Sequence, residues 1–314
     1  MTRSWFLILT FSCAAAAENA ARNQVVRVVA VSQADMNRSG PKVLEETIER
    51  LDRAASFRPD IAALPELFVD GPPETVPGPV TERLSQWARR YSSYVVFGIK
   101  TKAGIRVCNS AVLLDRNGRV AGRYDKMHPT EGELEKGIHP GDTDPPVFQT
   151  DFGAIGVQIC FDVNWWDNWK RLKAKGAKIV FFPAAYPAAK QLSAISLMNQ
   201  MFVVSSTQSR PSRIYDITGD VLAVSGQFQP YASAAIPIGK RLFEIDFHTR
   251  KARDIQKKYG PKVDVEWHHD DDWFTLASLA PELTVEDLIA EYSLTPLDDY
   301  RIRAKKAIDA ARQK

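Results

Sequence analysis

The sequence predicts an α/β fold built from layered sheets. Short runs rich in valine, isoleucine and alanine alternate with amphipathic segments of helical spacing, and this alternation is typical of helices packed on sheets. The 314 residues are 45% hydrophobic and 25% charged, as in a globular protein with a sizeable core. The formal net charge of +3, from 41 basic and 38 acidic residues, is too small to indicate a nucleic-acid partner or an anionic membrane surface.

The first elements are well marked. A valine-rich strand is predicted at residues 24–33 and an amphipathic helix at residues 42–57. A second, short strand at residues 60–64 ends abruptly at Pro65-Glu66, and another helix follows at about residues 80–91. This order of strand, helix and strand is that of an α/β unit.

Three strands come next, at residues 94–100, 107–114 and 119–124. Asn117-Gly118 lies between the last two and is a hairpin signal, so we expect these two strands to pair. Residues 127–146 have no regular period and are dense in glycine, proline and acidic residues. An ordered loop is expected there, and long ordered loops in compact domains often carry function.

The following strand, residues 154–159, runs straight into Cys160. The elements predicted after it are helices at 165–175 and 192–201 and strands at 178–182, 202–206, 214–224 and 232–238. Beyond about residue 250 the pattern weakens. Two helices, at 285–292 and 298–312, are expected to form a carboxy-terminal extension rather than a second domain.

The amino terminus has the order of a secretory signal peptide. Arg3 supplies a positive charge, residues 5–11 are apolar, and residues 12–17 are small, which predicts a signal peptide at 1–17 with cleavage near Ala17. The mature protein is therefore expected to be secreted or periplasmic, without a membrane span, because the apolar run is too short to cross a bilayer. An alternative interpretation makes Cys13 a lipid-attachment site.

Three strand ends carry residues that could perform chemistry: Glu66, Lys126 and Cys160. Taken singly, Glu66 could be a solvated carboxylate, Lys126 a surface lysine and Cys160 a buried core cysteine. Together they are more informative, because strand ends of an α/β sheet converge at the functional edge. A carboxylate that activates a thiol, a cation that holds an oxyanion and a sulfur that forms a thioester make up one mechanism. A helix starting just after Cys160 would also lower the pKa of its thiol.

The chain resembles the nitrilase, or carbon–nitrogen hydrolase, superfamily. The matching motifs are Ala63-Leu-Pro-Glu66-Leu-Phe, Gly122-Arg-Tyr-Asp-Lys126-Met-His and Gly153-Ala-Ile-Gly-Val-Gln-Ile-Cys160-Phe-Asp, in that order, with a weaker similarity at Asn109-Ser-Ala-Val-Leu. The resemblance implies a four-layer α-β-β-α sandwich, with residues 18–250 as the hydrolase domain. It also implies a homodimer or larger homo-oligomer, formed through the helices beside the nucleophile and the extension at 251–314.

The resemblance further implies the role of each residue. Glu66 would deprotonate Cys160, whose thiolate attacks a carbonyl carbon, and Lys126 with the backbone N–H of Phe161 would hold the oxyanion. No metal or cofactor is needed for this mechanism. A second glutamate of the family lies on the loop after the lysine. The candidates for this position are Glu131, Glu133 and Glu135. Glu133 is favoured because it lies seven residues after Lys126, close to the spacing usual in the family.

The residues after the nucleophile depart from the family. Nitrilases usually have Trp-Glu there, whereas this chain has Phe161-Asp162, which favours an amide substrate over a nitrile and leaves N-carbamoyl compounds open. Asp162, Trp165 and Trp166 are candidates for the substrate pocket, although the tryptophans could equally serve core or oligomer packing. A non-enzymatic alternative is an exported binding protein that retains the fold. Such a protein would be expected to have lost one of the three chemical residues.

Two other features are not assigned to the site. Cys108 lies within a strand, where a small buried apolar residue is expected, and a disulfide to Cys160 would disable the mechanism, so both thiols are predicted to be free. The run from His268 to Asp272 could bind a metal only with difficulty, because adjacent histidines point in different directions. A solvated polar loop is the favoured interpretation.

Overall fold

The computed structural model describes residues 25–38, 40 and 42–313. The predicted signal peptide, together with Cys13, lies outside these residues. The chain divides into two compact units, one of residues 26–236 and one that begins at Pro237. Within the described ranges, no helix has both the length and the hydropathy needed to span a bilayer.

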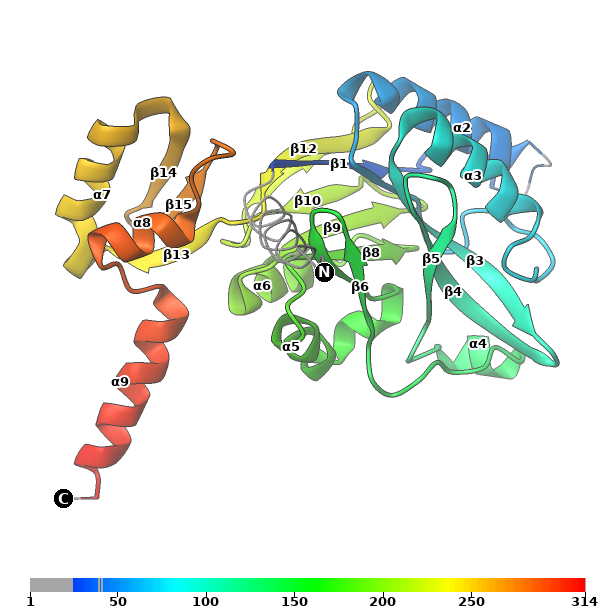
Figure 1. Ribbon diagram of the computed structural model, residues 1–314. Coiled ribbons are helices and arrows are strands. Elements are labelled where there is room, and N and C mark those ends of the chain that lie inside the picture. Colours follow the sequence, from blue (N-terminus) through cyan, green and yellow to red (C-terminus); the bar gives the residue numbers. More distant parts are fainter. Residues whose placement is uncertain (1–24, 39, 41, 314) are drawn as a thin grey trace, which may run out of the picture. The chain divides into compact units, whose positions relative to one another are not determined.

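The first unit contains two six-stranded sheets (Figure 1). In spatial order the first sheet consists of β12 (Tyr231–Pro237), β1 (Val25–Val31), β2 (Ile61–Ala63), β3 (Tyr94–Ala103), β4 (Arg106–Leu114) and β5 (Val120–Asp125). The second consists of β11 (Val221–Val224), β10 (Arg213–Tyr215), β9 (Phe202–Thr207), β8 (Ile179–Ala184), β7 (Gly153–Val157) and β6 (Val147–Thr150). The central strands of each sheet are parallel, so their carboxyl ends share an edge.

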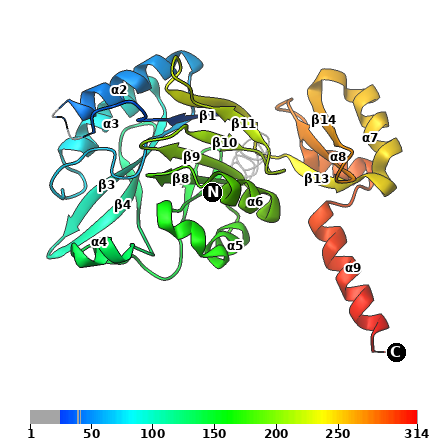
Figure 2. The ribbon, with the colours of Figure 1, turned by 180° about the vertical axis from the view of Figure 1, so that it is seen from behind.

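Helices cover the outer faces of both sheets. The helices α2 (Val43–Ala54) and α3 (Pro79–Tyr91) pack on the first sheet, with which they share a buried apolar core. On the second sheet lie α5 (Trp166–Ala174) and α6 (Ala189–Asn199) (Figure 2). Between the sheets, the buried hydroxyl of Ser206 on β9 donates to the carbonyls of Val31 (2.6 Å) and Ala63 (3.2 Å). The predicted four-layer α-β-β-α sandwich is therefore confirmed.

Local turns account for the elements that the sequence pattern missed. The strand predicted at 214–224 is two strands, β10 and β11, because Asp216 to Asp220 form a turn in which Gly219 has a φ of 86°. The loop at 127–146 contains the one-and-a-half-turn helix α4 (Glu131–Glu135). A capping box between Thr130 and Glu133 begins this helix, and an element so short has no detectable period.

The second unit has a sheet of its own. The antiparallel strands β13 (Arg241–Glu244), β15 (Trp273–Ser278) and β14 (Val263–His268) lie beside α7 (Ile245–Tyr259), α8 (Val285–Tyr292) and α9 (Leu297–Ala311). The sequence predicted only the last two helices and placed the boundary at residue 250. The unit begins earlier because β13 pairs with β15, about thirty residues further along, and such distant pairing leaves no local pattern.

A buried histidine in the second unit generates a pH prediction. His248 on α7 is 6% exposed, and its Nε2 accepts a hydrogen bond from the backbone N–H of Thr295 (3.1 Å). Burial, with the charges of Lys251 and Arg303, lowers the pKa of His248. Because the unfolded imidazole keeps its ordinary pKa near 6.5, this contact contributes its full stability above about pH 6.5 and loses it as the pH falls further.

We expect the Thr295 amide to be less protected from hydrogen exchange at pH 5 than at pH 7, after correction for intrinsic exchange rates, with the loss beginning below about pH 6.5. The His248→Leu variant should show low protection at both pH values. His269→Leu, an exposed histidine in the same unit, serves as control and should behave like the wild type. Protection of Thr295 that does not change with pH in the wild type would contradict the prediction.

Candidate active site

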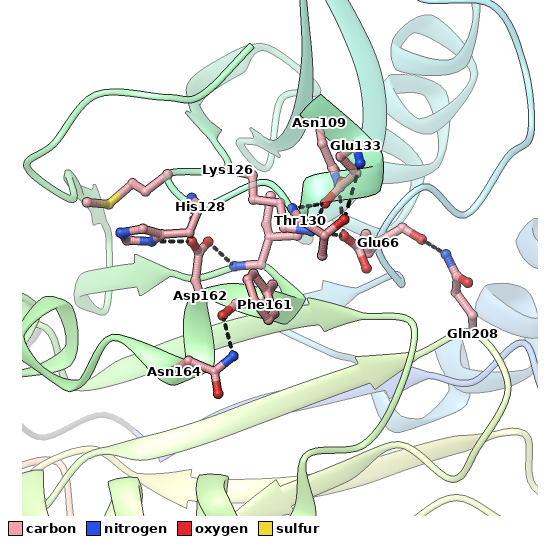
Figure 3. Close-up of polar contacts among 12 residues, drawn as sticks. Glu66, Asn109, Lys126, His128, Thr130, Glu133, Phe161, Asp162, Asn164 and Gln208 are labelled. Atoms are coloured by element: carbon pink, nitrogen blue, oxygen red, sulfur yellow. Dashed lines mark hydrogen bonds and ion pairs between the residues drawn. The ribbon is translucent and has the colours of Figure 1, made fainter. Parts of the chain in front are cut away.

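Glu66 lies just beyond the carboxyl end of β2, where the backbone approaches β3 unusually closely. A Cβ atom at Gly98 of β3 would lie 2.6 Å from the Cα of Glu66, so only glycine allows this approach. The side-chain amide of Gln208 donates to the carbonyl of Glu66 (Figure 3). The Glu66 side chain is only 5% exposed and is held from both sides of the strand end.

Lys126 follows β5 and makes two ion pairs within a buried network. Its Nζ lies 2.9 Å from Oε1 of Glu66 and 2.7 Å from Oε2 of Glu133, and the Lys126 side chain is 1% exposed. Asn109 of β4 donates through Nδ2 to Glu66 and to Glu133, at 2.8 Å each (Figure 3). The structure thus brings together the predicted Glu66, Lys126 and Glu133, whereas Glu131 and Glu135 are exposed on α4.

The charges of the network oppose the effect of burial. Burial lowers the pKa of Lys126, but the Glu66 carboxylate, the neighbouring Cys160 and Glu133 together raise it above its ordinary value. The pKa of Glu133 is shifted the other way. Burial raises it, but hydrogen bonds from Lys126, from the Thr130 N–H and from Asn109 bring it below its usual range. Lys126 and Glu133 are therefore both charged at neutral pH.

Cys160 occupies a sharp turn directly after β7. Its φ of 47° lies in the left-handed region, and its side chain is buried, with 8% of the residue exposed. The Glu66 carboxylate and the backbone N–H of Ala185, which follows β8, lie close enough to the thiol to shift its pKa. Cys160 thus lies beside the carboxylate that also binds Lys126. Cys160 and Cys108 are both free thiols, as predicted.

The protonation of Cys160 differs from the sequence-based expectation. Burial, and then the negative charge of Glu66, raise the pKa of the Cys160 thiol well above its ordinary value, although Lys126 and the Ala185 N–H act in the opposite direction. The predicted helix effect is missing because Cys160 opens a five-residue 3₁₀ helix, Cys160–Asn164, and α5 begins only at Trp166. The raised pKa favours a thiol rather than a thiolate at Cys160 at neutral pH.

Asp162 holds the turn that carries Cys160. It is fully buried, and its carboxylate accepts hydrogen bonds from the Tyr124 hydroxyl (2.7 Å), the Ile159 N–H (2.9 Å) and the His128 N–H (2.9 Å). This placement differs from the expectation that Asp162 lines the substrate pocket. With both oxygens occupied and no exposed surface, it positions the strand end that precedes the nucleophile.

The two tryptophans line a cavity of about 480 Å³ beside the network. The Trp165 indole stacks on the His128 imidazole, with 3.8 Å between ring centroids, and contacts the Phe161 ring edge-on at 5.2 Å. Trp165 is 37% exposed and Trp166 46%. The cavity wall includes Met127 and His128, which follow Lys126, but not Glu66, Lys126 or Cys160 themselves.

Sequence reasoning missed several residues of the site. Asn109 was noted only as part of a motif, yet an amide inside the apolar strand β4 is a signal that it has a buried partner. Tyr186 follows Ala185. Burial raises the pKa of its phenol, and Cys160 and Glu66, which lie near it, act in the same direction. Nothing in the sequence links Ala185 or Tyr186 to Cys160, because their proximity depends on the pairing of β7 with β8.

The arrangement defines a class of protein. A buried thiol in contact with a carboxylate, which also binds an ammonium group, can form a thioester with an acyl group and stabilise the oxyanion of that step. Within residues 25–38, 40 and 42–313, no cluster of histidine, cysteine and acidic side chains could hold a metal ion. The site and the four-layer fold are those expected of a cysteine-dependent hydrolase.

Comparison with known proteins identifies the family. Residues 28–240 match the carbon-nitrogen hydrolase family, and the chain belongs to that family. It is similar to a bifunctional nitrilase/nitrile hydratase of Lupinus angustifolius (29% identity, 58% of this chain and 61% of that protein) and a β-ureidopropionase of Arabidopsis thaliana (36% identity, 36% and 29%). The matches thus span less than two thirds of these two relatives.

A third relative is matched over most of its length. The deaminated glutathione amidase of Synechocystis sp. is 27% identical over 62% of this chain and 85% of that protein. Among solved structures, an amidase from Nesterenkonia sp. superposes with a TM-score of 0.60 at 18% identity, over 69% of this chain and 92% of the amidase. At that identity the likeness concerns the fold alone.

The coupling between Glu66 and Cys160 predicts how the thiol reacts. Because the Glu66 charge raises the thiol pKa and the Lys126 charge lowers it, Glu66→Gln should leave a larger thiolate fraction. We expect iodoacetamide to alkylate Cys160 several times faster at pH 8 in Glu66→Gln than in the wild type, with peptide mass mapping separating Cys160 from Cys108. Glu135→Gln, an exposed glutamate, should alkylate as the wild type does. Slower alkylation in Glu66→Gln would refute the coupling.

Proposed function

We propose that the protein hydrolyses non-peptide amides to a carboxylic acid and ammonia or an amine, through a thioester on Cys160. The observation that carries this proposal is the contact of the Cys160 thiol with Glu66, whose carboxylate also binds Lys126 at 2.9 Å. All three residues are buried, and each lies beyond the carboxyl end of a strand: β2 or β5 of the first sheet, or β7 of the second. Membership of the carbon-nitrogen hydrolase family supports the same chemistry.

The proposed mechanism has two stages. Glu66 takes the proton of Cys160 as the sulfur attacks the amide carbon, and the oxyanion is held by Lys126 Nζ and the backbone N–H of Phe161. As the C–N bond breaks, Glu66 returns the proton to the leaving nitrogen. Water, deprotonated by Glu66, then attacks the thioester. The acid leaves, and the proton returns to the sulfur.

In this proposal Glu133 acts through its neighbours. It shares Lys126 and Asn109 with Glu66, so it orients both groups that contact the catalytic carboxylate. Removing its charge would let the Lys126 ammonium turn toward Glu66 alone and away from the position of the oxyanion. We therefore assign Glu133, rather than Glu131 or Glu135, as the second glutamate of the site.

An amide is the favoured substrate class. Phe161-Asp162 replaces the Trp-Glu that is usual in nitrilases, and the Synechocystis relative is named as an amidase. Nitrile hydrolysis is the second candidate, since the Lupinus relative is named a nitrilase. N-carbamoyl compounds are the third candidate, since the Arabidopsis relative is named a β-ureidopropionase. We propose that Trp165 and Trp166, with the cavity they line, contact part of the substrate.

Export and assembly are part of the proposal. The signal peptide expected at residues 1–17 supports a secreted or periplasmic protein, with lipid attachment at Cys13 as the alternative. The family resemblance supports a homo-oligomer contact through α5, the helix that follows Cys160. The segment 251–314 is proposed to contribute to the same assembly. Mass analysis of the exported protein, together with light scattering, tests both points.

A panel of paired amides and nitriles tests the activity. The wild type should release ammonia from at least one amide and form an acyl adduct on Cys160 that intact mass detects. Cys160→Ala should lose about a thousandfold or more of the turnover and form no adduct, because Cys160 supplies the thiol beside Glu66 and Lys126. Cys108→Ser serves as a matched control and should retain activity. Unchanged turnover by Cys160→Ala would refute the mechanism.

The three glutamates of α4 provide an internal comparison. Glu133→Gln should lower kcat by about 100-fold, while Glu131→Gln and Glu135→Gln should stay near the wild type, because only Glu133 contacts Lys126 and Asn109. Steady-state kinetics on one amide, with circular dichroism to confirm folding, measures this difference. Equal losses in all three variants would indicate that α4 contributes structure rather than a specific carboxylate.

A further inference from the structure

A second cavity, which Cys160 does not line, lies where three loops of the first unit meet. Its volume is about 580 Å³. The loops follow β1, β9 and β11, and α2 contributes one side chain. The lining residues that carry charge or a side-chain hydroxyl are Ser32, Asp35, Arg50, Ser209, Arg210 and Ser225. None of the residues assigned to the proposed thioester chemistry lines this cavity.

The walls of the cavity are fixed by hydrogen bonds between the loops. The backbone N–H of Ser32 donates to the Pro230 carbonyl (2.9 Å), and its hydroxyl donates to the Arg210 carbonyl (3.0 Å). The N–H of Gln33 donates to the Thr207 carbonyl (3.0 Å). Three segments distant in sequence are thus held in place, so the cavity is a formed part of the fold rather than a gap between mobile loops.

The charge of the cavity is positive and unbalanced. Arg50 is half-buried, and its Nη1 donates to the carbonyls of Ser32 and Ala34 (3.0 Å to the latter). Neither Arg50 nor Arg210 has a carboxylate within ion-pair distance in the described part of the chain. Burial and then the charge of Arg53 lower the pKa of Arg50, and the carboxylates of Asp35 and Glu46 only partly offset this.

A buried hydroxyl adds a neutral donor. Ser225 is 5% exposed, and its Oγ accepts a hydrogen bond from the Ser212 N–H (2.9 Å). The hydroxyl hydrogen itself has no acceptor among the residues that the structure describes. A nearly buried O–H without an acceptor is costly, and an acceptor atom inside the cavity would satisfy it.

We propose that this cavity binds a small oxyanion, a carboxylate or phosphate group, between Arg50 and Arg210. Guanidinium groups bind oxyanions through charge-assisted hydrogen bonds, and an anion would supply the counter-charge that half-buried Arg50 lacks. The Ser225 hydroxyl would donate to the same anion. A cationic ligand is disfavoured, because the residues that line the cavity include two arginines and a single carboxylate, Asp35.

The cavity is also linked to the catalytic loop. Ser209 in its wall donates through Oγ to the Ala185 carbonyl (3.0 Å), and the N–H of Ala185 contacts the Cys160 thiol. Ser209 thus connects the cavity to Ala185, which lies beside Cys160. The residues that would bind the anion are separate from those of the proposed thioester chemistry.

Calorimetric titration with inorganic phosphate, and separately with succinate, at constant ionic strength tests the proposal. The wild type should bind at least one of the two saturably, and the stronger ligand distinguishes a phosphate site from a carboxylate site. Arg50→Gln and Arg210→Gln should weaken that binding by about tenfold or more, while Arg50→Lys should retain part of it. Arg119→Gln, an exposed arginine on the same unit, should bind as the wild type does.

The Cys160→Ala protein separates this site from the proposed reaction. Binding that persists in Cys160→Ala supports a distinct anion site whether or not the amidase activity is found. Arg210 is exposed, so its variant is expected to fold even if Arg50→Gln does not. No saturable binding of either anion, or equal affinity in the wild type, Arg210→Gln and Arg50→Lys, would overturn the proposal.

Discussion

The burial of one lysine constrains the rest of the site. The Lys126 side chain is 1% exposed, and an isolated ammonium so far from water would cost several kcal/mol. Two carboxylates offset that cost, one from the end of β2 and one from α4. Glu133 can reach Lys126 only if residues 127–146 are ordered, so the folding of this loop and the formation of the catalytic network are one requirement. The capping box of Thr130 and Glu133 fits this role, because the same carboxylate starts the helix and binds the lysine.

The nucleophile depends on a second set of contacts from the same strand. Tyr124 and Lys126 are two residues apart, so on an extended strand they share a face. The Tyr124 hydroxyl binds Asp162, which also holds the backbone N–H of Ile159 just before Cys160. The end of β5 therefore sets the position of both the cation and the turn that carries the thiol. A left-handed φ at a non-glycine residue persists only where such surrounding contacts maintain it.

Much of this arrangement could be predicted from the sequence, and the reasons for the failures are specific. Period-two and helical patterns located the strands and helices of the sandwich. The convergence of strand ends predicted that Glu66, Lys126 and Cys160 lie together, although Cys160 follows a strand of the second sheet. Asp162 was predicted to line the pocket because its neighbours in the sequence are the same whether its side chain faces a pocket or the core. The small sheet of the second unit was missed because its strands are only four to six residues long, and β13 pairs with a strand some thirty residues away.

The raised pKa of Cys160 has a consequence for how the site rests and works. Thiolates, rather than thiols, react with oxidants and alkylating agents, so a buried protonated thiol is slow to be modified. That property suits a protein proposed to be exported to an oxidising compartment. The cost is that the proton must leave at the moment of attack, and the carboxylate beside the thiol is that of Glu66. Glu66 is itself held by Lys126 and Asn109, so a substrate carbonyl that draws Lys126 toward its oxygen would free Glu66 to take the proton. Deprotonation of the thiol is then tied to the arrival of a substrate rather than to the pH of the surroundings.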